Sequence, residues 1–112
     1  MIRPAIAAFL LCASPALADD VYHMDGARNN CRFGPGGEGI VSVGPGTLSL
    51  TETHYERVSE RKPLADGWYR ATWACMSEGT ECGRSVIDLR ITPRRIDVRL
   101  DGTTLSAQRC PG

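Results

Sequence analysis

The sequence lacks a second long hydrophobic run and an excess of charge of either sign. Beyond the apolar residues 5–13, no segment approaches the roughly 20 apolar residues that span a bilayer. Thirteen basic and thirteen acidic residues give a formal net charge of +0. No global field therefore favours nucleic acid or an anionic membrane. We expect no nucleic-acid partner, and no membrane span after residue 18.

Residues that carry chemistry are also scarce. Only His23 and His54 are histidines, no serine lies in a Gly-x-Ser-x-Gly turn, and no Cys-x-x-Cys motif occurs. His23 and His54, with Met24 and Met76, offer soft ligands for copper, but their spacing does not require a shared site. The sequence therefore predicts no metal, no cofactor and no catalytic residue.

The first 18 residues have the three parts of a secretory signal peptide. Arg3 supplies a positive charge, residues 5–13 are apolar, and residues 16–18 read Ala-Leu-Ala, a small-residue cleavage site. Cleavage after Ala18 would release a domain that begins at Asp19. We therefore predict a periplasmic or secreted protein.

Removal of this peptide discards Cys12 and leaves four cysteines, which an oxidising compartment would convert to disulfides. Intervals of 43, 6 and 27 residues separate them, too wide for a zinc cluster. Four cysteines allow three pairings. Strand geometry favours Cys75–Cys82 across the base of a hairpin, which leaves Cys31–Cys110 to fasten the N-terminal segment to the last strand.

Composition divides the remaining chain into two parts. Residues 19–39 are rich in Asp, Asn, Gly and Pro and predict an irregular segment, whereas residues 40–112 alternate apolar and polar residues, as strands do. Residues 52–62 fit either a strand that frays or a short helix, and we favour the strand. The prediction is an all-β fold of about six strands, a small antiparallel sandwich or partly open barrel stapled by disulfides.

The C-terminal half specifies its own register. A two-residue turn at Pro93-Arg94 and another at Asp101-Gly102 place apolar pairs on one face and opposite charges on the other. The expected pairs are Ile91–Ile96, Leu89–Val98, Ile87–Leu100, Arg90–Asp97, Asp88–Arg99, Val98–Leu105 and Ile96–Ala107. A slip by one residue would place every pair on the wrong face.

One aromatic strand carries the best binding signal. Alternation places Trp68 on one face of this strand and both Tyr69 and Trp73 on the other. One face must enter the core. If the other face is open, it exposes one or two aromatic residues beside Arg70, a composition that is enriched in recognition surfaces. The alternative is that loops cover this second face and bury all three aromatic residues. The candidate binding residues are Trp68, Tyr69, Arg70 and Trp73.

Two segments resemble a group of small secreted bacterial β proteins of unassigned function. Residues 73–79 read Trp-Ala-Cys-Met-Ser-Glu-Gly, and residues 108–111 read Gln-Arg-Cys-Pro, similar to the Trp-x-Cys-x-x-Glu-Gly and terminal Arg-Cys of that group. The likeness covers about residues 31–110. Many members carry a cysteine near the second strand, where residues 52–55 have none and Cys82 is present instead. The resemblance implies a secreted β fold and no particular activity.

We therefore predict a non-enzymatic secreted or periplasmic domain that binds a protein or an envelope component. A small hydrolase or metal-binding protein that uses Glu78, Glu81, His54 or His23 is the alternative from another class. A purely structural envelope component is a third interpretation.

Overall fold

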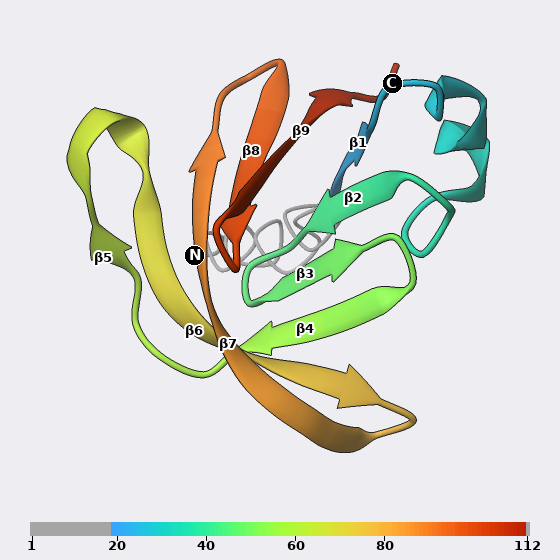
Figure 1. Cartoon of the computed structure of the whole chain (residues 1–112). Coiled ribbons are helices and arrows are strands. Elements are labelled where there is room, and N and C mark those ends of the chain that lie inside the picture. The colour runs from blue at the N-terminus through green and yellow to red at the C-terminus, as the bar shows by residue number, and fades with distance from the viewer. Residues whose placement is uncertain (1–18, 112) are drawn as a thin grey trace, which may run out of the picture.

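The computed structural model describes residues 19–111, so the predicted signal peptide and Cys12 lie outside the described residues. The described chain forms nine strands and two short 3₁₀ helices (Figure 1). The strands are β1 (Asp20–His23), β2 (Ile40–Val43), β3 (Thr47–Leu50), β4 (Thr53–Arg57), β5 (Lys62–Pro63), β6 (Tyr69–Ser77), β7 (Thr80–Ile91), β8 (Arg95–Leu100) and β9 (Thr103–Arg109); the helices are η2 (Arg28–Phe33) and η3 (Ala65–Gly67).

Eight of these strands close into an antiparallel barrel. Neighbours follow the order β4-β3-β2-β1-β9-β8-β7-β6, and a further pairing of β4 with β6 joins the two ends. β5 is an extra strand that pairs with the start of β6. The all-β prediction is confirmed, but the predicted count of six strands and the sandwich or partly open barrel are imprecise. Closure of the barrel depends on β1 and β4. The local sequence indicates these two strands only weakly.

β1 lies inside the segment that composition predicted to be irregular. Its four residues pair with β2, with Tyr22 opposite Val41, and two of them also pair with β9, with Tyr22 opposite Arg109. Both partner strands are remote in sequence, so no local sequence pattern predicts β1. Within residues 52–62, the favoured strand is present as β4, and the helical alternative is wrong.

The predicted register of the last three strands is confirmed at every pair. β7 and β8 place Arg90 opposite Asp97 and Asp88 opposite Arg99, while Val98 faces Leu105 on β9. At the β8–β9 turn, Asp101 and Gly102 have φ values of 53° and 78°. Positive φ at both central residues is the signature of the primed turn that the Asp-Gly sequence predicts.

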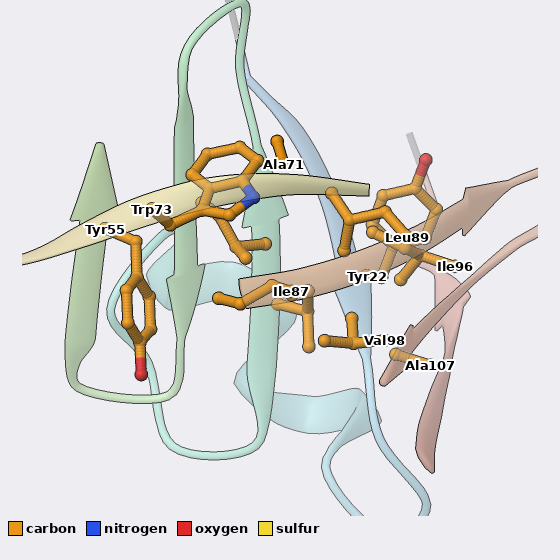
Figure 2. Close-up of a cluster of buried hydrophobic side chains, with 11 residues drawn as sticks. Tyr22, Tyr55, Ala71, Trp73, Ile87, Leu89, Ile96, Val98 and Ala107 are labelled. Atoms are coloured by element: carbon orange, nitrogen blue, oxygen red, sulfur yellow. The ribbon is translucent and has the colours of Figure 1, made fainter. Parts of the chain in front are cut away.

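The core fills the barrel interior (Figure 2). β6 directs Ala71 and Trp73 inward, and Trp73 is 1% exposed beside the buried Ile87 of β7. An eight-stranded barrel has an interior just wide enough for side chains to fill. The other large, fully buried core residues are Tyr22, Ile40, Leu48, Leu89, Ile96, Val41 and Val98.

Two disulfides fasten the barrel at separate places. Cys31 of η2 bonds to Cys110 after β9, and Cys75 bonds to Cys82 across the β6–β7 hairpin. This is the pairing that strand geometry favoured from the sequence. Within residues 19–111, no helix has the length and apolar character needed to cross a membrane.

Candidate functional site

The outer surface of β6, β7 and β8 carries charged side chains between the core positions. Because successive side chains of a strand point to opposite faces, the residues that alternate with the buried apolar ones lie outside the barrel. We call this surface the arginine face. It consists of Trp68, Arg70, Asp88, Arg90, Arg95, Asp97 and Arg99.

Asp88 is shared by two arginines from the neighbouring strands. Arg70 donates from Nε and Nη2 to its two oxygens at 2.8 and 3.0 Å, and Arg99 donates from Nε at 3.1 Å. Asp88 is only 4% exposed. A buried carboxylate is tolerated when it is paired and hydrogen-bonded in this way.

Asp97, on the neighbouring strand β8, is also shared by two arginines. Arg90 donates to Oδ2 at 3.1 Å, Arg95 donates to Oδ1 at 3.0 Å, and the Ser106 hydroxyl also donates to Oδ1. Asp97 is 2% exposed, whereas the arginine side chains remain 34–53% exposed. Four arginines therefore surround two aspartates, and two positive charges are in excess. Each guanidinium carries five N–H groups, so donors remain for an external acceptor.

These contacts lower the pKa of both carboxyls. The hydrogen bond from Arg70 is the largest influence on the pKa of Asp88, and it outweighs the opposing effect of burial. Burial is the largest single influence on the pKa of Asp97 and would raise it, but hydrogen bonds from Ser106, Arg95 and Arg90 together lower it. Both aspartates therefore stay ionised at a lower pH than an ordinary aspartate does.

The lowered values predict that acid destabilises the barrel. A carboxyl whose folded pKa lies below its unfolded value of 3.8 contributes stability that is present above pH 3.8 and is lost as the pH falls through the folded pKa. Urea unfolding from pH 7 to pH 2 should show the free energy of unfolding declining once the pH falls below about 5.

Asp88→Asn should flatten this decline and cost roughly 1–3 kcal/mol at pH 7, because it removes charge-assisted hydrogen bonds to a buried group. Glu81 pairs with Arg84 on the exposed hairpin, and its pKa is also lowered, so Glu81→Gln is the matched control with a small effect. An unfolding free energy that stays constant from pH 6 to pH 2 would contradict the prediction.

The Trp68 ring contacts two arginines of the arginine face. Its ring centroid is 4.0 Å from Cζ of Arg99 and 4.7 Å from Cζ of Arg90, within the range of a cation–π interaction. Asp66 and Gly67 precede it with φ values of 62° and 82°. This left-handed pair reverses the chain in η3. As a result, Trp68 lies on the outside of the barrel, whereas the next residue, Tyr69, packs against the core.

A groove of about 440 Å³ adjoins Trp68. Its lining residues are Arg61, Pro63, Leu64, Gly67, Trp68 and Tyr69, and we call it the Trp68 groove. The Arg61 guanidinium lies 5.2 Å from the centroid of the Tyr69 ring. Burial raises the pKa of Tyr69 above its ordinary value of 10.0, so its hydroxyl remains a hydrogen-bond donor at neutral pH.

The structure brings three of the four candidate binding residues together. Trp68, Tyr69 and Arg70 lie at the groove or on the arginine face, with Trp68 and Tyr69 half-buried and Arg70 exposed. Trp73 is buried in the core, so the structure corrects its assignment to a surface site. The sequence analysis missed Arg61. It predicted the ion pairs of Arg90 and Arg99, but not that Trp68 covers both.

Among the residues of the enzymatic alternative, the sheet register places His54 opposite Met76, whose other cross-strand neighbour is Glu81. His54 Nδ1 lies 3.1 Å from Ser49 Oγ, and His54 Nε2 lies 3.9 Å from Glu56. Ser49, His54 and Glu56 lie on β3 and β4, each of which pairs with a strand on both sides. In residues 19–111, no three histidine, cysteine, aspartate or glutamate residues are placed to hold a metal ion. His23 Nδ1 contacts the Met24 carbonyl instead.

No protein-family model, curated protein or solved structure matches the chain. The geometry of the arginine face and the Trp68 groove is therefore the basis for a functional assignment. Partly exposed aromatic rings among fixed arginines are typical of a recognition surface.

Proposed function

We propose that the protein is a non-enzymatic binding module that uses the arginine face and the Trp68 groove to hold a macromolecular partner. The observation that supports this most strongly is the fixed position of Trp68 over Arg90 and Arg99. Trp and Arg are the residues that most often dominate binding energy at interfaces. Because Asp88 and Asp97 already hold the arginines, little side-chain entropy is lost on binding.

We further propose that the mature protein acts in the periplasm or outside the cell. Two disulfides support an oxidising compartment, where such bonds persist. The signal-peptide pattern of residues 1–18 and the resemblance to small secreted β proteins agree with this location. In this setting the partner is a protein or another component of the cell envelope.

Capture from an envelope extract under oxidising conditions tests the binding proposal. Trp68→Ala should reduce the captured partner about tenfold, because truncation of a central interface tryptophan commonly costs more than 1.4 kcal/mol. Phe33→Ala is the matched control. Phe33 is 62% exposed, has Arg32 4.9 Å from its ring centroid, and belongs to η2, across the barrel from β5 (Figure 1).

The Phe33→Ala protein should capture as much partner as the unchanged protein. Equal capture by Trp68→Ala and the unchanged protein would overturn the assignment of the site. Circular dichroism and thermal unfolding of each variant would show that the barrel is intact.

A further inference from the structure

The Trp68 groove has a largely apolar lining and adjoins the arginine face, which carries an excess of positive charge. We infer that it receives one large apolar side chain from an acidic protein segment, whose neighbouring carboxylates pair with the exposed arginines. This inference rests on the proposed function and specifies the chemistry of the partner. Two observations carry it: the composition of the groove and the excess positive charge around it.

The lining favours an apolar side chain. Four of the six lining residues are apolar or aromatic, namely Pro63, Leu64, Trp68 and Tyr69. A volume of about 440 Å³ lies within the range of ordinary ligand pockets and holds a phenylalanine or leucine side chain. An aromatic or aliphatic group seated here would exclude water from both rings, which is the arrangement of an interface hot spot.

The excess positive charge of the arginine face beside the groove favours an acidic segment. The arginine face carries two positive charges in excess, and Arg61 and Lys62 add two more beside the groove. Glu60 and Asp66 are the acidic residues nearest in sequence, and they offset only those last two charges. Guanidinium groups that are already oriented pair with carboxylates in a bidentate manner, which gives both orientation and specificity.

The ring geometry favours a protein segment over an acidic sugar. A sugar ring would stack on an aromatic ring, but guanidinium groups already lie against both rings: Arg99 and Arg90 at 4.0 and 4.7 Å from the Trp68 centroid, and Arg61 at 5.2 Å from that of Tyr69. Pro63 and Leu64 add aliphatic surface to the groove, and this suits an apolar side chain. We therefore commit to an acidic peptide segment with one apolar anchor.

Defined probes test this chemistry. Fluorescence anisotropy would compare three labelled hexapeptides: five acidic residues with one phenylalanine, the same peptide with serine in place of phenylalanine, and a version with the acids replaced by lysine. An oligogalacturonate supplies the acidic-sugar comparison. The first peptide should bind at least about tenfold more tightly than each of the other probes, since both the anchor and the charges contribute.

Variants localise the binding. Trp68→Ala and Arg61→Gln should each weaken binding of the first peptide, the former about tenfold and the latter severalfold. Arg84→Gln is the matched arginine control, because Arg84 pairs with Glu81 on the β6–β7 hairpin. Phe33→Ala is the aromatic control, and both controls should bind within about twofold of the unchanged protein. Trp68→Phe retains an aromatic ring and should bind with intermediate affinity, which guards against misfolding of the alanine variant.

The outcomes separate this inference from the proposed function. Equal binding of the phenylalanine and serine peptides would overturn the apolar anchor, and tighter binding of the oligogalacturonate would overturn the protein segment. If the acidic peptide does not bind but capture from extract still depends on Trp68, the inference fails and the proposed function stands. If capture is also independent of Trp68, both fail.

Discussion

Replacing Trp73 with alanine should lower the free energy of unfolding by about 3–5 kcal/mol, the usual cost of truncating a buried tryptophan. Trp73 is 1% exposed and belongs to the buried cluster that also contains Ala71, Ile87 and Tyr55 (Figure 2). The closed barrel restricts how far the surrounding chain can collapse into the cavity that the alanine variant leaves. Urea unfolding followed by circular dichroism measures the loss, which is a large share of the roughly 5–15 kcal/mol that stabilises a typical domain.

Two controls sharpen this prediction. Trp73 Nε1 has no hydrogen-bond partner in the described structure, so Trp73→Phe loses volume but no hydrogen bond and should cost much less than alanine. Trp68→Ala removes the chain's other tryptophan from the outer surface and should cost less than about 1.5 kcal/mol. Equal destabilisation by Trp68→Ala and Trp73→Ala would contradict the assignment of Trp73 to the core.

Removal of the Cys31–Cys110 disulfide should have a comparably large effect. These cysteines are 79 residues apart in sequence, so the bond restricts nearly the whole unfolded chain. The loop-entropy relation gives about 4–5 kcal/mol for a closure of this length. Urea unfolding of the double variant Cys31→Ser with Cys110→Ser would therefore show a barrel that is marginal or unfolded at 37 °C.

The second disulfide supplies the comparison. Cys75 and Cys82 are 7 residues apart, and the same relation gives about 2–3 kcal/mol for the double serine variant. Both double variants replace two cysteines by two serines, so the chemical change is the same and only the loop length differs. A larger loss from the short closure than from the long one would contradict this explanation.

The sequence predicts the fold best where the contacts are local. β7, β8 and β9 are joined by two-residue turns, and their apolar and charged residues alternate strictly, so one register satisfies both faces. The Asp101-Gly102 turn adds a backbone preference that agrees with that register. Pattern, turn chemistry and pairing thus point to the same structure, and every predicted pair is present.

Prediction fails where pairing is non-local. β1 is only four residues long, and its partners, β2 and β9, lie respectively about 20 and 85 residues away in the chain. The pairing of β4 with β6 skips β5 and cannot be read from any hairpin signal. These three pairings close the barrel, which explains why a sandwich or partly open barrel was a reasonable but imprecise expectation.

The candidate site divides in the same way. Alternation correctly separates Trp68 from Tyr69, but it does not reveal which face of β6 enters the core, and Trp73 follows Tyr69 inward. The ion pairs of Arg90 and Arg99 follow from the β7–β8 register. Their contact with Trp68 depends on the left-handed conformations of Asp66 and Gly67, and the residue types alone do not specify how far that turn carries the ring.

The first half of β7, which lies at the register shift of the β6–β7 hairpin, bears on self-association at high protein concentration. β8 pairs with β7 only from Ile87 to Ile91, so the earlier part of this strand lacks that neighbour in the described chain. An uncovered strand is a template for intermolecular sheet growth. Here the ladder shifts register between Cys75 and Met76, and Gly83 adopts a φ of 130°. The distortion interrupts the flat edge on which another molecule's strand would add, so we expect the hairpin that carries the short disulfide to disfavour intermolecular strand addition.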